Sequence, residues 1–211
     1  MEMKWVMAVG QAEATMKTAD RILQSATECF ALSGFDRTNL RDIAQKVGIR
    51  EPSIYRHFKS KEELYQKALH KGLAPVADAL LQLTQRKMDP REMIEVPGMM
   101  LRLHAQNPHV ASLLQQAVTM PADHFENQLL EEWLKKLLET GKQALMKADY
   151  DSADEVDISL QILNLFNLCI GYFTNGSLLE RLCGMRPDDP EVLRRQERIL
   201  RVTSRAWAIS A

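Results

Sequence analysis

Apolar residues recur at helical spacing along almost the whole chain, and nowhere do four or more β-branched residues alternate with polar ones. One stretch shows the i, i+3, i+4, i+7 pattern of a half-buried helix, with Leu40, Ile43, Ala44 and Val47. Because the alternation that marks strands is missing, we expect an all-α fold. The 211 residues are 45% hydrophobic, which is enough to bury a core in one large or two smaller domains.

Capping and helix-breaking residues place the expected helices. The first four should begin after Thr18, at Thr38 as an N-cap, at Pro52, and at a capping box of Ser60 and Glu63. Gly34, in a left-handed conformation, and Gly48 should end the first two, and the helix from Pro52 should run for about two turns. Further helices are expected near 76–87, 91–106, 109–119, 123–148, 154–182 and 189–208, with Pro97 and Gly98 bending or dividing the second of these.

Charge is distributed unevenly along the chain, although the net charge is only -1. Residues 37–71 hold nine Lys/Arg and four Asp/Glu, whereas residues 72–211 hold 15 and 19. This split predicts a basic working surface in one domain and a different role for the other. Gly72 and Pro75 mark the junction, so we expect an N-terminal arm (1–17), a first domain (18–71) and a second domain (72–211).

No segment is expected to enter a membrane. The stretch Ile158–Phe173 is shorter than the ~20 apolar residues that span a bilayer and contains four polar side chains, so it is expected to be a buried helix. The three cysteines, Cys29, Cys169 and Cys183, are widely spread and form no CxxC. This pattern predicts neither a disulfide framework nor a zinc site, and it favours a reducing cytoplasm.

Residues 38–58 follow the pattern of a helix-turn-helix motif: a capped amphipathic helix, a short turn and a second short helix. In this motif the second helix enters the major groove of DNA, so it should expose hydrogen-bond donors and planar side chains. It carries such residues, namely Ser53, Tyr55, Arg56 and His57, with Arg50 just before it. Arginine can donate two hydrogen bonds to guanine, and Tyr and His can contact phosphate or thymine methyl groups.

The stretches CFALSGFDRT and LRDIAQKVGIREPSIYRHFKSKEEL resemble the DNA-binding domain of the tetracycline-repressor (TetR) family of transcriptional regulators, over about residues 18–71. The resemblance implies backbone contacts from Arg41, Tyr55, His57 and Lys61, and base reading by Arg50, Glu51, Pro52, Ser53 and Arg56. Members of the family usually carry a small polar residue at the position of Arg50. The cation of Lys61 opposes the helix dipole by ~0.3 to 1 kcal/mol, which a bound DNA phosphate would offset.

The second domain is expected to bind a small molecule. Its mixture of apolar and polar residues suits a mostly apolar ligand with one or two hydrogen-bonding groups. The expected lining consists of Met99, Leu103, His104, Gln115, Trp133, Phe166 and Asn167. A filled core, in which these residues only pack, is the alternative interpretation.

The last two long helices are expected to form a homodimer interface. The stretch 154–182 is apolar around much of its circumference, which is more than one subunit's core needs, and the family resemblance implies that the last two helices pair with their copies. The expected interface residues are Ile162, Phe166, Ile170, Phe173, Leu193, Leu200 and Trp207.

These patterns predict a homodimeric cytoplasmic regulator that binds a palindromic operator in double-stranded DNA and is released by an unidentified small molecule. Repression, rather than activation, rests on the family resemblance. A constitutive architectural DNA-binding protein without a ligand is the alternative. A helical enzyme is more remote, because the sequence has no GxSxG, Walker A, GxGxxG or HExxH motif. No metal or cofactor is expected.

Overall fold

A computed structural model describes residues 17–86, 89–147 and 155–210, so the expected arm 1–17 lies outside the described residues except for Lys17. The described residues form helices and no strand, which confirms the all-α prediction. The chain divides after Lys71 into two compact units, residues 1–71 (unit 1) and 72–211 (unit 2).

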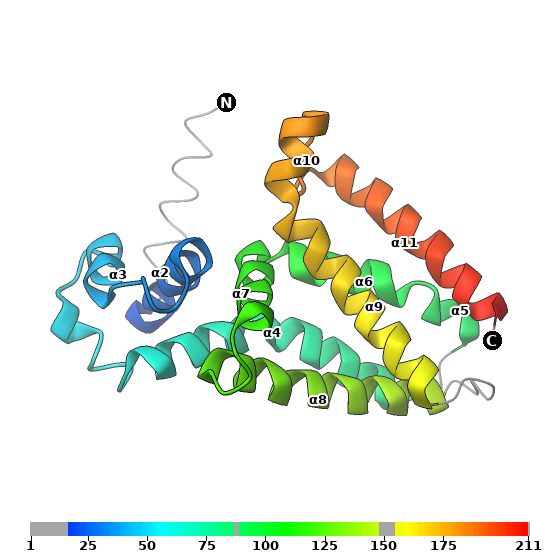
Figure 1. Cartoon of the computed structure of the whole chain (residues 1–211), viewed down its shortest axis with the longest axis horizontal. Coiled ribbons are helices and arrows are strands. Elements are labelled where there is room, and N and C mark those ends of the chain that lie inside the picture. The colour runs from blue at the N-terminus through cyan, green and yellow to red at the C-terminus, as the bar shows by residue number, and fades with distance from the viewer. Residues whose placement is uncertain (1–16, 87–88, 148–154, 211) are drawn as a thin grey trace. The chain divides into compact units, whose positions relative to one another are not determined.

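Unit 1 is built from α2 (Thr18–Ser33), α3 (Leu40–Val47), the 3-10 helix η1 (Glu51–Ser53) and the first part of α4 (Lys61–Thr84) (Figure 1). Its fully buried side chains include Ile22, Phe30, Ile43, Ile54, Leu64 and Tyr65. The rings of Phe30, Phe35 and Tyr65 contact one another, with centroids 5.2 to 5.8 Å apart. This aromatic cluster joins α2 and the loop after it to α4.

The helix ends of unit 1 confirm one expected cap and correct another. The backbone N–H of Glu63 donates to Ser60 Oγ at 3.2 Å, as the capping box predicts. The N-cap of α3 is Asn39, not Thr38: the Asn39 side chain accepts a hydrogen bond from the Arg41 N–H at 2.9 Å. The Thr38 hydroxyl instead points to the carbonyls that precede α3, and it donates to those of Cys29 and Gly34.

The second helix of the helix-turn-helix motif, residues 51–57, is called the recognition segment here, and it is less regular than predicted. In place of a two-turn α-helix from Pro52, η1 is one 3-10 turn followed by turns through His57. Its bonds join residues three apart, as from the Ile54 N–H to the Glu51 carbonyl. Gly34 also differs, because its φ of 79° is combined with a ψ of 165°, outside the left-handed helical region.

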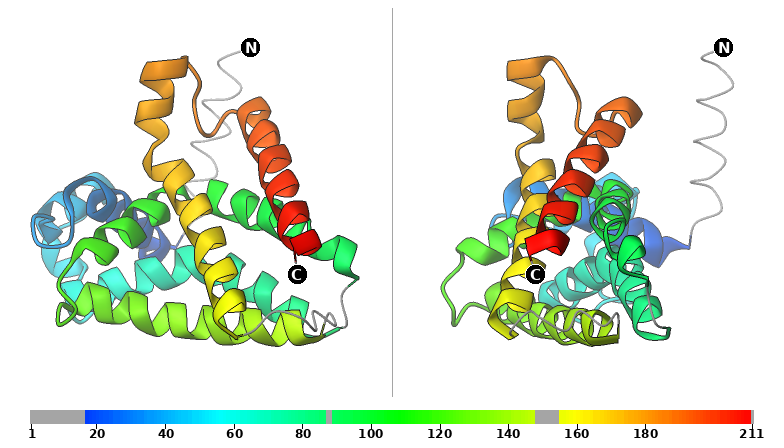
Figure 2. Two further views of the ribbon diagram at one scale, coloured as in Figure 1. Left: turned by 45° about the vertical axis from the view of Figure 1, so that its right-hand side comes forward. Right: turned by 90° about the vertical axis from the view of Figure 1, so that its right-hand side faces the viewer.

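The described part of unit 2 contains the rest of α4 followed by α5 (Pro90–Met93), α6 (Val96–Ala105), α7 (Pro108–Thr119), α8 (Phe125–Lys147), α9 (Glu155–Thr174), α10 (Gly176–Cys183) and α11 (Pro190–Ser210). Helix α9 packs on α6, α7 and α8, and α11 packs on α6. Figure 2 shows α9 and α10 running one way and α11 returning in the opposite direction.

Two expected boundaries in this region are wrong, and one expected division is confirmed. Helix α4 continues through Pro75, because Leu73 and Val76 on either side are buried and their packing outweighs the one hydrogen bond that proline removes. The expected division of helix 91–106 is confirmed, because α5 ends at Met93 and α6 begins at Val96. Pro97 lies in the first turn of α6, where proline is favoured. The expected helix 154–182 is divided at Asn175 into α9 and α10. Gly176 follows, where a Cβ would lie 2.6 Å from Cγ of Pro187.

Helix α9 is only partly the buried helix that we expected. It has 20 residues and is, by length and composition alone, long and apolar enough to cross a membrane. Only 22% of its most apolar stretch is buried inside the structure. Its buried residues are Ile158, Phe166, Cys169 and Ile170, whereas Val156, Leu160 and Leu168 are exposed. The exposed apolar side chains therefore lie outside the core of their own unit.

The three cysteines are free, with Cys29 and Cys169 buried and Cys183 exposed at the end of α10. Burial raises the pKa of the Cys169 thiol to about 12.

Candidate DNA-binding motif and ligand cavity

The helix-turn-helix motif is held to the rest of unit 1 by its inner side. Ile54 and Phe58, one helical turn apart, are 1% and 3% exposed. The guanidinium of Arg21 donates a hydrogen bond to the Val47 carbonyl at 2.7 Å, which ties the end of α3 to α2. Because these inward contacts fix the motif, the side chains between Ile54 and Phe58 point to solvent.

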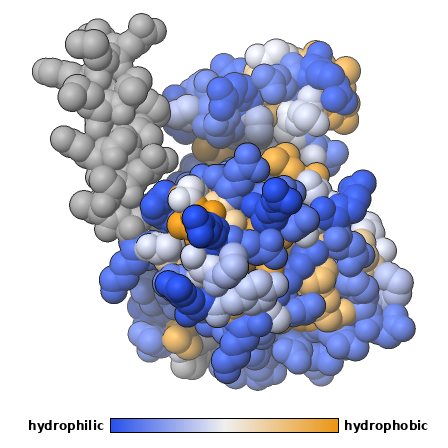
Figure 3. Space-filling model, turned by 90° about the vertical axis from the view of Figure 1, so that its left-hand side faces the viewer, coloured by the Kyte–Doolittle hydropathy of each residue, from blue (hydrophilic) through white to orange (hydrophobic). Residues whose placement is uncertain are grey.

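The side chains expected to contact DNA lie mostly on that outer side. The exposed ones are Arg41, Arg50, Pro52, Tyr55, Arg56 and His57, and the half-buried ones are Glu51, Ser53 and Lys61. The guanidinium groups of Arg50 and Arg56 make no hydrogen bond or ion pair with any described residue. Figure 3 shows mostly hydrophilic residues over the face that it presents. The motif can therefore offer free cationic donors to a partner.

Lys61 has partners within its own chain. Its Nζ donates to the Asp36 carbonyl at 3.2 Å and lies 4.4 Å from the centroid of the Phe35 ring. A cation–π contact stabilises by ~0.5 to 1 kcal/mol at an exposed site. These contacts offset the unfavourable position of the cation in the first turn of α4, a role that the sequence reasoning gave to a DNA phosphate.

Lys59 is a candidate that the sequence reasoning missed. It is exposed, lies directly after the motif, and its backbone N–H is bonded to the Glu63 carboxylate. The Glu63 carboxylate accepts this hydrogen bond from Lys59 and not from Ser60, so the capping box of Ser60 and Glu63 also fixes the backbone at Lys59. The Lys-Ser-Lys sequence around the capping box was the available signal.

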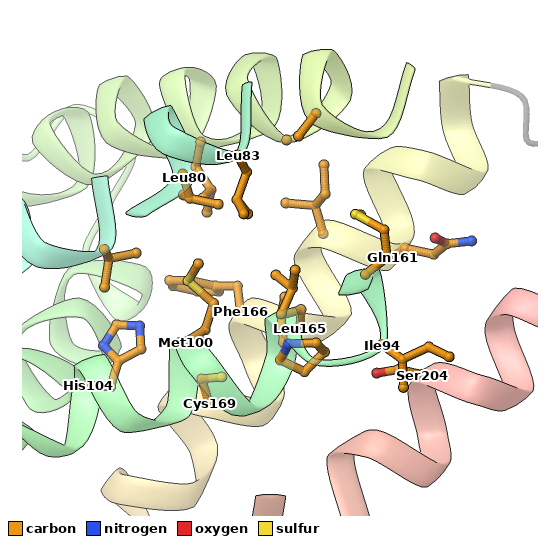
Figure 4. A pocket seen from close by; sticks show the side chains of 18 of the residues that line it. Leu80, Leu83, Ile94, Met100, His104, Gln161, Leu165, Phe166, Cys169 and Ser204 are labelled. Carbon is orange, nitrogen blue, oxygen red and sulfur yellow. The ribbon is translucent and has the colours of Figure 1, made fainter. Parts of the chain in front are cut away.

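A cavity of about 130 Å³ lies within unit 2, bordered by α4, α6, α8 and α9 (Figure 4). An apolar cavity of ~150 Å³ accepts benzene, so this space suits a small apolar molecule. Its wall is largely aliphatic and aromatic, including Val76, Leu80, Leu83, Met93, Val96, Met100, Trp133, Leu137, Ile162, Leu165 and Phe166. The second domain is therefore not a completely filled core.

The structure brings only some of the expected lining residues together. His104, Trp133 and Phe166 line the cavity, and the last two rings have centroids 6.1 Å apart. Gln115 and Asn167 are exposed, so their expected place in the lining is wrong. Met99 and Leu103 pack against the hydrophobic core beside the cavity without lining it.

His104 and Ser204 are the buried polar residues among the described residues that line this cavity. His104 is 6% exposed, and its imidazole makes no hydrogen bond with a described residue. Burial lowers the pKa of His104 to about 4, so the ring is neutral at pH 7. A neutral imidazole offers one N–H donor and one nitrogen acceptor.

Several residues expected at a dimer interface face the core of their own chain instead. Phe166, Ile170 and Leu200 are buried, and Ile162 lines the cavity with Phe166. Phe173 and Leu193 pack against the same core. The side chain of Trp207 lies outside the described residues. The exposed apolar side chains of this region are others: Val156, Leu160, Leu168, Leu178, Leu182, Ile199 and Val202.

The exposed motif and the helical architecture of the described residues are those of a helix-turn-helix protein. Residues 22–68 match the family model of bacterial regulatory proteins, tetR family. This match lies within unit 1 and agrees with the resemblance seen in the sequence.

Known relatives match over the N-terminal part, and solved structures match over most of the fold. IcaR of Staphylococcus epidermidis, a negative transcriptional regulator of the biofilm operon icaADBC, is 36% identical over 63 residues, 30% of this chain and 34% of IcaR. The chain thus matches about a third of the length of this relative.

Two solved structures show the same fold. AibR, in complex with isovaleryl coenzyme A and operator DNA, has a TM-score of 0.67 at 15% identity, covering 89% of this chain and 97% of that chain. FadR of Bacillus subtilis, in complex with stearoyl-CoA, has a TM-score of 0.60 at 16% identity, covering 85% and 96%. At these identities the likeness is one of fold alone.

Proposed function

We propose that this chain is a transcriptional repressor that binds operator DNA through unit 1 and is released when a small molecule occupies the cavity of unit 2. The observation that carries the proposal is the pair of exposed, unpartnered guanidinium groups, Arg50 and Arg56, on a tetR-type motif. IcaR and AibR support it, since the first is named a negative regulator and the second was solved with operator DNA and a ligand.

In this proposal Arg50 and Arg56 read base edges in the major groove, with Glu51, Pro52 and Ser53 lining the same end of the segment. Arg41, Tyr55 and His57 contact the phosphate backbone, and Lys59 joins them. Lys61 holds the loop before α3 in place and contributes to phosphate binding only at the expense of its own partners.

The chain acts as a homodimer on a palindromic site. The dimer interface is formed by exposed apolar residues of α9 and α11 in place of the residues expected from the sequence. These are Leu160, Leu168, Ile199 and Val202. Leaving such large apolar side chains in water is unfavourable by roughly 25 cal/mol per Å², so a second copy gives them cover. Two recognition segments about 34 Å apart then match successive major grooves.

Release follows from a shift between two populations. Helix α4 contributes Lys61 to unit 1 and Val76, Leu80 and Leu83 to the cavity wall, so one helix belongs to both sites. To move the ratio of the DNA-binding to the released state from 99:1 to 1:99, the ligand must bind the released state more tightly by about 5.5 kcal/mol in total. The two cavities of a dimer would each supply about half of this free energy.

Selection of double-stranded DNA from a random library, followed by fluorescence anisotropy on the enriched site, tests the proposal. We expect palindromic sites and a slope of log affinity against log salt of about -5, from about six neutralised phosphates per dimer. Arg56→Ala should weaken binding, whereas Arg181→Ala, an exposed arginine of α10, should not. Failure to enrich any site, or a slope shallower than about -2, would contradict DNA recognition.

A constitutive architectural DNA-binding protein remains the second candidate, and it needs no cavity. The apolar cavity in unit 2 favours the ligand-released repressor over it. The relatives are regulators and not enzymes, and we propose that this chain likewise has no catalytic activity and acts in the cytoplasm.

A further inference from the structure

We infer that the cavity selects an uncharged, mostly apolar molecule with one hydroxyl or carbonyl group, and that His104 is the side chain that recognises this group. The inference rests on the proposed function, because it names the chemical class of the releasing ligand.

The cavity wall offers few polar groups. Among the described residues that line it, none carries a charged side chain. The hydroxyl of Ser204 already donates to the Leu200 carbonyl at 2.9 Å. In Figure 4 the amide of Gln161 extends away from His104 and Phe166, at the other end of the labelled residues.

His104 lies at one end of this apolar space. It is on α6, one helical turn after Met100, and both side chains line the cavity (Figure 4). The imidazole is nearly enclosed and has no hydrogen-bond partner among the described residues. A ligand that supplies a hydrogen bond to this ring, inside an otherwise apolar wall, therefore gains affinity.

Charge in the ligand works against binding here. Burial holds the His104 ring neutral without a ligand, so a carboxylate would gain a counter-ion only at the cost of protonating this buried ring. An anion in this cavity would lose its hydration without a described cation to replace it. A neutral hydroxyl or carbonyl, by contrast, needs only the one donor or acceptor that a neutral imidazole provides.

Three probes with the same methyl-substituted ring isolate these effects. Toluene has no polar group, p-cresol adds a neutral hydroxyl, and 4-methylbenzoate adds a carboxylate. Isothermal titration of the full-length protein at pH 7.5 should find p-cresol bound roughly 2- to 10-fold more tightly than toluene, the range of one hydrogen bond. We expect 4-methylbenzoate to bind at least tenfold more weakly than p-cresol, because its charge is desolvated without a counter-ion.

Two variants assign the recognition to one residue. In His104→Phe the ratio of p-cresol to toluene affinity should fall to about one while toluene still binds, which shows that the cavity is intact. His104→Leu serves as a second variant should the phenyl ring prevent folding. Gln161→Leu is the matched control, because it removes a polar side chain of the same lining and should leave the ratio unchanged.

The outcomes separate this inference from the proposed function. Tighter binding of 4-methylbenzoate or isovaleryl coenzyme A than of p-cresol would overturn it, as would a ratio that His104→Phe leaves unchanged or that Gln161→Leu abolishes. Absence of binding by both uncharged probes up to their solubility would also overturn it. Operator binding, measured without any probe, is independent of these results, so its failure would sink the proposed function instead.

Discussion

The buried imidazole of His104 predicts a specific dependence of stability on pH. The pKa of this histidine falls from 6.5 to about 4 on folding because burial disfavours the charged ring. Between these two values the unfolded chain binds a proton that the folded chain does not, so stability is lost as the pH falls below about 6.5. Above that range the ring is neutral in both states and contributes no pH dependence.

The size of the effect follows from the two pKa values. Lowering the pH from 7.5 to 5.0 should destabilise the folded protein by about 2 kcal/mol through His104 alone. In His104→Phe this contribution disappears. The free energy of unfolding of the wild type should therefore fall by about 2 kcal/mol more than that of the variant over the same range.

Urea unfolding at fixed protein concentration, followed by circular dichroism at several pH values, measures this difference. His70→Gln is the control, since it removes an exposed histidine of α4 and leaves the buried ring in place. Parallel pH dependence of wild type and His104→Phe, within about 0.5 kcal/mol, would refute the buried neutral imidazole.

Three further predictions concern other parts of the molecule. Arg50→Ala and Arg56→Ala should each cost roughly 1 to 3 kcal/mol on the selected site and relax base preference at one position per half-site, whereas a uniform loss across sequences would assign that arginine to phosphate. Ile199→Asp, at a position 59% exposed in one chain, should yield monomers in sedimentation velocity, and unchanged dimers would place the interface elsewhere. Gly72→Ala would bring a Cβ to 2.1 Å from Cγ2 of Val110, so it should lower the free energy of unfolding by about 1 to 3 kcal/mol, measured by thermal unfolding. Unchanged stability would show that α4 and α7 do not pack closely at this point.

Local patterns in the sequence predicted the motif well because its signals are local. The spacing of Ile54 and Phe58 fixes which side of the recognition segment faces inward, and the Ser60 cap depends only on residues within one turn. Asn39 and Thr38 show the limit of this reasoning. Both can cap a helix, and the choice depends on carbonyls that the fold brings to Thr38.

The faces of α9 could not be assigned from the sequence because apolar residues occupy most of its circumference. Phe166 and Leu168 differ in burial only through the positions of α6, α7 and α8, which periodicity does not specify. The residues that line the cavity were hard to predict for the same reason, since they too depend on where the neighbouring helices lie. His104 was recognisable as a polar residue in an apolar stretch, whereas Gln115 and Asn167 satisfied the same criterion and lie on the outside.

The unequal exposure of the three thiols makes the natural protein suitable for labelling at one site. A maleimide reagent at neutral pH should react with Cys183 at the end of α10, because Cys29 is buried and the enclosed Cys169 thiol is not ionised. A dimer would then carry two spin labels without any substitution. The distance between them, measured by pulsed electron paramagnetic resonance with and without p-cresol, would report directly on movement of the last helices.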